Sequence, residues 1–256
     1  MPPSDPTAPS QRQTRPQAID PAIGGAEPAP IAHPAIEAAL DALPATLHSR
    51  SGSVFYSGRA AFSAPSKIYI LGLNPGGDPT VQAAETIEAH RQKFREGPSW
   101  WSEYADESWG GALAGSWGMQ PRVLHMLDRL GLDPHAVPAS NLIFVRSSTE
   151  ATLLAEKGAL MRACWPVHQA VIDALVIQVV LCFGGTAGRW ARDELGAQEL
   201  VDCYQETNRR RWSSEAHRAG DGRMVLTLTH PGRANWCNSD SDPSSLVQRV
   251  LGRFRS

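Results

Sequence analysis

Two short segments of the sequence carry side chains that could take part in a reaction. Residues 72–77 (GLNPGG) combine glycines and a proline, which force a tight turn and expose backbone amides and the Asn74 side chain. Residues 229–233 (THPGR) place His230 at the end of an apolar run, next to a proline and three residues before Arg233. An amide and an imidazole offer hydrogen-bonding groups near neutral pH rather than a strong base. Taken alone, each segment also fits an ordinary turn or a structural histidine.

A third segment, residues 183–188 (FGGTAG), has the composition of a phosphate-binding turn, but it matches neither the GxGxxG pattern nor the Walker pattern. The four cysteines lie far apart in the chain, and the eight histidines form no HxxxH pair. Neither arrangement is typical of a zinc or iron–sulfur ligand set, and four cysteines are too few for a disulfide framework. We therefore expect no metal ion and no cofactor.

The polar segments follow apolar runs that are typical of buried strands. Residues 67–71 (KIYIL) and 178–183 are short continuous runs of the kind found in parallel sheets. Further strands are expected at 141–145 and 223–229, and strands that alternate with helices predict a three-layer α/β/α domain with a mainly parallel four-stranded central sheet. Ligands of such sheets bind beyond the carboxyl ends of the strands. Helices are expected at residues 80–95, 119–130, 157–175, 186–195 and 243–254, with a hairpin turn at 220–222. Pro166 is expected to kink the helix over 157–175 or to divide it into two.

Residues 72–77 and residues 229–233 together resemble two motifs of the uracil-DNA glycosylase superfamily. Its members carry a motif of the form G-x-N-P-G after a strand, and residues 72–76 are similar to it. A second motif, beginning with H-P, follows the last strand of these proteins, and His230 opens a similar segment. Asn141 and Arg146 resemble a pair found on the second strand of one branch. The resemblance covers roughly residues 66–236, and it implies the glycosylase fold without an iron–sulfur cluster, because the cysteine spacing of that cluster is absent.

The resemblance implies hydrolysis of the N-glycosidic bond of uracil, or of another deaminated base, flipped out of DNA in base-excision repair. His230 would stabilise the departing base anion by donating a hydrogen bond, and Asn74 would position the attacking water. Asn141 would read the Watson–Crick edge of the base, since an amide offers both a donor and an acceptor. The residues expected to surround the base are Gly72, Leu73, Gly76, Phe94 and Asn141, and those expected to contact DNA are Arg146 and Arg233.

The aromatic residue that stacks on the base in this family has no counterpart at the matching position, which holds Thr86. Phe94, or Trp100 and Trp101 further along, would have to take its place. Residues 98–118 hold four of the eight tryptophans together with several glycines. Such a segment suits either a packed cluster that covers the core or a wall that stacks on bases.

Composition fits one globular domain over residues 35–256. Apolar residues make up 42% of the chain, charged residues 20%, the net charge is −2, and no apolar run is long enough to cross a membrane. Residues 1–34 hold nine of the twenty prolines, which predicts a disordered leader. With no secretory signal, a cytoplasmic monomer is expected. From Arg209 onward the chain contains nine arginines and only four acidic residues. This local excess of positive charge predicts a basic surface around His230 that contacts DNA.

Two other functions remain open. A protein that kept this fold without the reaction would bind nucleic acid in a salt-sensitive way and release no base. An N-glycosidase for free nucleosides or nucleotides would use the same residues and would not need the arginine-rich C-terminal surface.

Overall fold

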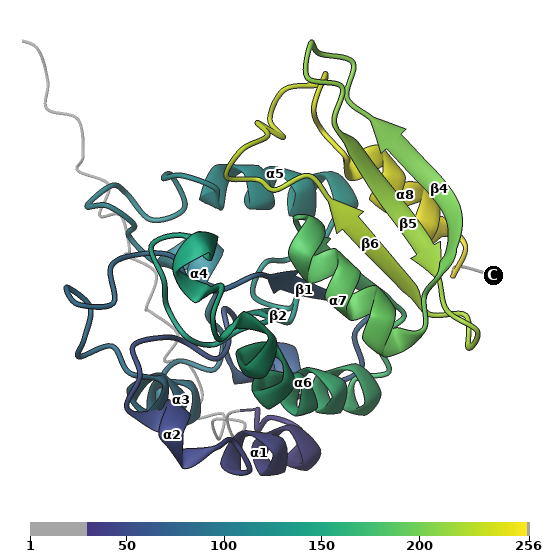
Figure 1. Ribbon diagram of the computed structural model, residues 1–256. Helices are drawn as coiled ribbons and strands as arrows, with labels where there is room; N and C mark the ends of the chain where they lie inside the picture. The colour runs from purple at the N-terminus through teal and green to yellow at the C-terminus, as the bar shows by residue number, and fades with distance from the viewer. Residues whose placement is uncertain (1–29, 255–256) are drawn as a thin grey trace, which may run out of the picture.

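The computed structural model describes residues 30–254 and has a mixed α/β fold built on one six-stranded sheet (Figure 1). The strands are β1 (Ile68–Gly72), β2 (Ala139–Asn141), β3 (Val179–Phe183), β4 (Glu199–Gln205), β5 (Ser213–Arg218) and β6 (Met224–Leu228). Their order across the sheet is β2-β1-β3-β6-β5-β4. The first four strands in this order are parallel, and β5 and β4 continue the sheet in antiparallel pairing.

Helices cover both faces of the sheet. They are α1 (Pro34–Asp41), α2 (Ala45–His48), α3 (Ile87–Glu96), α4 (Glu103–Asp106), α5 (Gln120–Leu130), α6 (Lys157–Ala174), α7 (Gly185–Leu195) and α8 (Ser244–Gly252). Side chains of β1 alternate between two cores, as expected for a strand buried on both faces. Tyr69 and Leu71 pack with α1, α6 and α7, whereas Ile68 and Ile70 pack with α5 and α8. The molecule therefore has three layers, with α7 in front of the sheet and α8 behind it in Figure 1.

The expected count of four strands is wrong, because β4 and β5 extend the sheet beyond the parallel strands. β5 and β6 form the hairpin expected around residues 220–222. β4 alternates exposed and half-buried positions along the edge of the sheet, so it has no apolar run that would predict a strand. The second strand ends at Asn141 rather than beginning there. Residues 142–145 instead run beside residues 51–53, where the Ser53 amide donates to the Phe144 carbonyl at 2.9 Å.

Two expected helices differ in detail from those observed. The helix expected over 80–95 begins at Ile87, because the Thr86 hydroxyl accepts a hydrogen bond from the Ala89 amide at 3.1 Å and caps it. The helix that Pro166 was expected to kink or divide is continuous, with the proline inside α6. The helices α5, α7 and α8 agree with the prediction to within one or two residues at each end.

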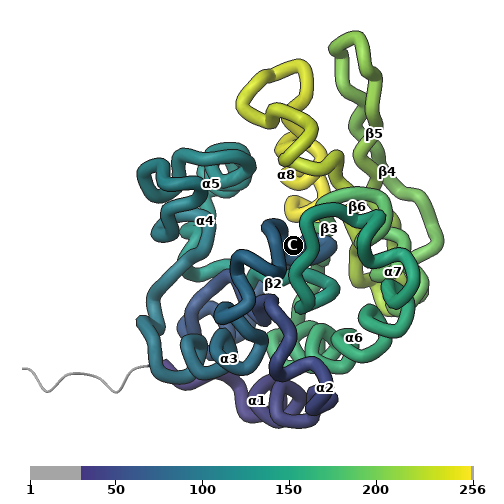
Figure 2. The backbone as a smooth tube through the Cα atoms, turned by 60° about the vertical axis from the view of Figure 1, so that its left-hand side comes forward, coloured from purple at the N-terminus to yellow at the C-terminus, as the bar shows by residue number. Residues whose placement is uncertain are grey.

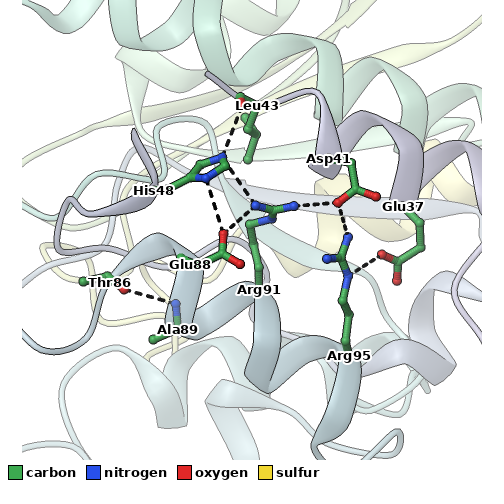
Figure 3. A network of polar contacts seen from close by, with 9 residues as sticks. All are labelled: Glu37, Asp41, Leu43, His48, Thr86, Glu88, Ala89, Arg91 and Arg95. Carbon is green, nitrogen blue, oxygen red and sulfur yellow. Dashed lines mark hydrogen bonds and ion pairs between the residues drawn. The ribbon is translucent and has the colours of Figure 1, made fainter. Parts of the chain in front are cut away.

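An ion-pair network joins α1 to α3 (Figure 3). The Arg91 guanidinium is 5% exposed and contacts Glu88 at 2.5 Å and Asp41 at 2.7 Å. Arg95, one turn later, pairs with Asp41 at 2.7 Å and with Glu37 at 2.9 Å. This network fixes the first helix against the helix that follows the GLNPGG turn.

The expected leader lies outside the described residues except for residues 30–34. Of these, Ala32 is buried, and Pro34 begins α1. Within residues 30–254, no helix is both long enough and apolar enough to cross a membrane.

Candidate functional site

The four parallel strands end together at one edge of the sheet. Gly72 of β1 pairs with Asn141 of β2, and Phe183 of β3 pairs with Leu228 of β6. The chain therefore leaves all four strands on the same side, and neighbouring strands lie about 4.8 Å apart. This edge brings together the GLNPGG turn after β1, Asn141 at the end of β2, the glycines after β3 and His230 after β6.

Asn74 is held by its own turn. Its Nδ2 donates to the Pro75 carbonyl at 2.8 Å and to the Ser147 hydroxyl at 2.9 Å. The backbone N–H of Ser147 also donates to the Pro75 carbonyl, at 3.1 Å. Because a carbonyl only accepts, the NH₂ group of Asn74 must face Pro75. The half-buried amide therefore keeps its oxygen, Oδ1, as an acceptor for a further donor such as water.

Arg146 supports this turn from the side. Its Nη1 donates to the Gly76 carbonyl at 2.5 Å, its Nη2 pairs with Glu85 at 2.7 Å, and its Nε donates to the Ser51 hydroxyl at 3.2 Å. The side chain is 10% exposed. We expected Arg146 to contact DNA, but the structure uses its donors to hold the loop that presents Asn74.

Asn141 has an unused donor. The side chain is 5% exposed, and its Nδ2 has no hydrogen-bond partner among the described residues. Its Oδ1 lies over the Gly72 backbone so closely that a Cβ at Gly72 would overlap it. A buried amide donor without a partner is costly in a folded protein, and a ligand that accepts from it would remove that cost.

Two residues that the sequence did not point to lie beside Asn141. The Tyr56 hydroxyl faces the Asn141 amide and the Ser53 hydroxyl, and burial raises the pKa of Tyr56 to about 12. The Ser53 oxygen is also buried, and no described residue bonds to it. The segment 51–57 reaches this place because it runs antiparallel to the chain at 140–145, with Phe55 opposite Ser140. The buried Ser53 and Asn141 and the half-buried Tyr56 thus form a polar cluster at the sheet edge.

Phe94 does not lie in this cluster. Its ring packs against Phe55 and Phe62, with centroids 4.8 and 5.6 Å away, inside the core on the α1 and α6 side. The ring of Tyr56 belongs to the opposite core and meets Tyr104 at 5.7 Å. Phe94 was the expected stacking residue, and Tyr56 is the aromatic side chain that the structure places next to Asn141 instead.

The remaining residues of the first motif have local roles. Leu73 is half-buried against the core on the α6 side, and its carbonyl accepts from the Ile143 amide at 2.8 Å. Gly76 is exposed, with open space where a Cβ would be. Together with Gly72, these residues shape the turn through their backbone.

His230 is a neutral imidazole with one free donor. The Gly232 amide donates to its Nδ1 at 2.9 Å, so in the neutral ring the hydrogen resides on Nε2. Burial, and then the positive charge of Arg233, hold the pKa of His230 below its ordinary value. The ring lies against Gly184 at the end of β3. The arrangement keeps His230 uncharged at neutral pH and able to donate from Nε2.

The tryptophan-rich segment is packed only in part, since Trp101 and Trp109 are half-buried whereas Trp100 and Trp117 are exposed. The Trp109 indole donates to Glu103 at 2.8 Å and that of Trp101 to Glu107 at 3.0 Å. Burial raises the pKa of Glu103. Trp100 stacks on His135 at the surface, with ring centroids 5.7 Å apart. Within the described part of the chain, no three His, Cys, Asp or Glu side chains are grouped to hold a metal ion.

The comparisons with known proteins identify no relative: no protein-family model matches this sequence, and no curated protein matches it.

Proposed function

We propose that the protein is a DNA glycosylase that hydrolyses the N-glycosidic bond of a deaminated base flipped out of DNA. The observation that carries this proposal is the state of His230, whose Nδ1 accepts from the Gly232 amide so that Nε2 is left as a donor. A base that leaves with the bonding electron pair carries a negative charge that is shared between its ring nitrogens and a carbonyl oxygen. A fixed donor at that oxygen stabilises the charge as it forms, without transferring a proton.

Asn74 provides the second part of the reaction. Hydrolysis needs a water molecule aligned with the sugar carbon that loses the base. The Asn74 oxygen is fixed as an acceptor by the bonds of its NH₂ group to Pro75 and Ser147. It orients a water by accepting one hydrogen but cannot take a proton as a carboxylate does, which implies a modest rate.

Asn141 provides base recognition. Uracil, hypoxanthine and xanthine each present a carbonyl beside a ring N–H, which matches the donor and acceptor of an amide. The unpaired Asn141 Nδ2 donates to the carbonyl, and the hydroxyls of the buried Ser53 and the half-buried Tyr56 complete the polar cluster. The cytoplasmic location expected from the sequence is part of this proposal.

The test is base release from oligonucleotides that contain uracil, hypoxanthine or xanthine, single- and double-stranded, followed by alkaline cleavage. His230→Ala and Asn74→Ala are expected to reduce excision about ten-fold to a thousand-fold, the effect of losing one preorganised donor or a positioned water. Asn238→Ala, an exposed asparagine outside the site, is the matched control and should behave as the parent.

Two outcomes would replace the proposal. Release of base from free nucleosides, with none from oligonucleotides, would identify a nucleoside hydrolase. Salt-sensitive DNA binding without release of any base would identify a nucleic-acid-binding protein without the reaction.

A further inference from the structure

The turn between β4 and β5 lies at the same edge of the sheet as His230. β5 is antiparallel to β6, so β5 begins where β6 ends. The Thr229 amide, one residue before His230, donates to the Ser214 hydroxyl at 3.0 Å. Residues 206–212 (ETNRRRW), which connect β4 to β5, therefore project beside the candidate site. Figures 1 and 2 both show this turn standing next to the loop that follows β6.

One arginine of this turn has a structural role. Arg210 lies 4.4 Å above the Trp212 ring, and its Nη1 donates to the Arg233 carbonyl at 2.6 Å. It also approaches the buried carboxylate of Glu206 at 3.4 Å, and the Asn208 amide donates to the same carboxylate at 2.9 Å. These contacts fasten the turn to the loop that carries His230 and Arg233.

The other arginines of this surface are left without carboxylate partners. Arg209, Arg211 and Arg233 are exposed, and none of them forms an ion pair with any residue from 30 to 254. The backbone of Arg211 has φ 55°, a left-handed conformation that a side chain of this size rarely adopts. At the opposite end of the hairpin, Arg218 pairs with Glu199 at 2.8 Å and Arg223 pairs with Asp221 at 2.6 Å. Among the described arginines from 209 onward, those without an ion pair therefore lie at the edge that holds the candidate site.

We propose that the β4–β5 turn is a phosphate clamp, in which Arg209 and Arg211 bind the backbone of the DNA strand whose flipped base lies at His230. This inference rests on the proposed function, to which it adds the strand-binding surface. Guanidinium groups match phosphate oxygens in geometry and charge, and an exposed group without a carboxylate partner loses no ion pair when it binds phosphate. Because Arg210 donates a hydrogen bond to the Arg233 carbonyl, the position of the clamp is fixed relative to the candidate site.

The clamp is tested by the affinity for an undamaged single-stranded oligonucleotide, measured by fluorescence anisotropy over a series of salt concentrations. Arg209→Ala/Arg211→Ala should weaken binding and reduce the slope of log affinity against log salt by about 1.4, or about 0.7 for each lost phosphate contact. The matched control, Arg218→Ala/Arg223→Ala, removes the same charge at the far end of the hairpin and should keep the slope. Circular dichroism and thermal unfolding verify that both variants fold. An unchanged slope, or an equal loss in the control, overturns the clamp.

A competitor identifies the class of partner. A polyglutamate peptide carries carboxylates in place of phosphates, and it should displace the oligonucleotide far less well than unlabelled DNA does. Equal displacement by the peptide would overturn the clamp in favour of an acidic protein partner.

Base excision separates this inference from the proposed function. With the enzyme in saturating excess, Arg209→Ala/Arg211→Ala should excise nearly as fast as the parent, whereas His230→Ala should bind DNA normally and excise about ten-fold to a thousand-fold more slowly. If no oligonucleotide loses a base but the salt slope still falls in the turn variant, the clamp stands and the proposed function fails. If excision occurs and the turn variant binds as the parent does, the clamp fails and the proposed function stands.

Discussion

The Arg233 side chain helps to keep His230 uncharged. Burial, and then the nearby guanidinium, hold the pKa of His230 below its ordinary value, so the ring stays neutral to a lower pH than a free histidine does. Arg233→Ala removes one of these two causes and should raise the pKa of His230. An NMR titration of the ring should show the shift directly, and the acid limb of the excision profile should move to higher pH with it. Arg218→Ala, on the far turn, should leave the titration unchanged, and the same result for Arg233→Ala would contradict the assignment.

The glycine at the end of β1 sets the position of Asn141. A Cβ at Gly72 would overlap Asn141 Oδ1, so Gly72→Ala should push the amide out of the polar cluster and reduce excision at least ten-fold. Because the effect acts through Asn141, the double variant Gly72→Ala/Asn141→Ala should be no slower than Asn141→Ala alone. Gly220→Ala, which has open space around it, is the control for an added methyl group. Additive losses in the double variant would show that Gly72 acts in another way.

At the residue scale, the sequence could predict the site only where strand ends determine it. Asn74, Asn141 and His230 come to one edge because parallel strands end together, which follows from the order of strands and turns. Ser53 and Tyr56 could not be predicted, because they reach Asn141 through isolated bridges rather than a regular strand. Nor does local sequence indicate that the donors of Arg146 are used by the loop that it supports.

At the element scale, the packing of α3 against α1 depends on one buried cation. Arg91 is 5% exposed between Asp41 and Glu88, whereas Arg95 is 34% exposed while pairing with the same Asp41 (Figure 3). Arg91→Ala should lower the free energy of unfolding by about 2 to 3 kcal/mol, because it removes a buried side chain and its paired contacts. Arg95→Ala should cost less than about 1 kcal/mol, as is typical of exposed ion pairs. Urea denaturation measures both, and equal losses would show that burial of Arg91 does not matter.

The elements that were predicted well are those with an unambiguous apolar pattern. The strands β1 and β3 are buried along their whole length, and α5 and α7 each end at a glycine with positive φ. β4 has the opposite character, since it lies at the edge of the sheet and its side chains are largely exposed. The second strand was misplaced because its apolar residues pair with the segment at 51–53, a contact between distant parts of the chain.

At the scale of the whole molecule, the fold decides which arginines are neutralised by ion pairs and which are left without a carboxylate partner. The C-terminal excess of arginine predicted a basic surface around His230, but Arg249 pairs with Asp202 at 3.0 Å, and Arg218 and Arg223 are paired as well. Between residues 209 and 254, the arginines without an ion pair are Arg209, Arg211 and Arg233, next to His230. A count of charges along the chain cannot tell which arginines stay unpaired, because the partners of each arginine are decided by the fold.

The core itself should make the protein sensitive to acid. His168 is fully buried, its Nδ1 lies 2.8 Å from the Tyr69 hydroxyl, and burial lowers its pKa to about 4. The folded-state pKa lies below the unfolded value of about 6.5, so the stabilisation is complete above about pH 6.5 and is lost as the pH falls toward 4. At 1.36 kcal/mol for each pKa unit, this one group accounts for a loss of about 3 kcal/mol.

The variant His168→Gln separates this effect from the other acid-sensitive groups. It removes the titrating ring, so its free energy of unfolding, measured in urea, should fall less steeply between pH 6.5 and 4 than that of the parent. His33→Gln, at an exposed position, should keep the steep dependence. If the free energy of unfolding falls equally steeply with pH in the parent and in His168→Gln, the acid sensitivity arises elsewhere in the protein. The same series decides how excision at low pH is interpreted: a loss that precedes unfolding reports protonation of His230, and a loss that accompanies unfolding reports failure of the core that holds the strand ends together.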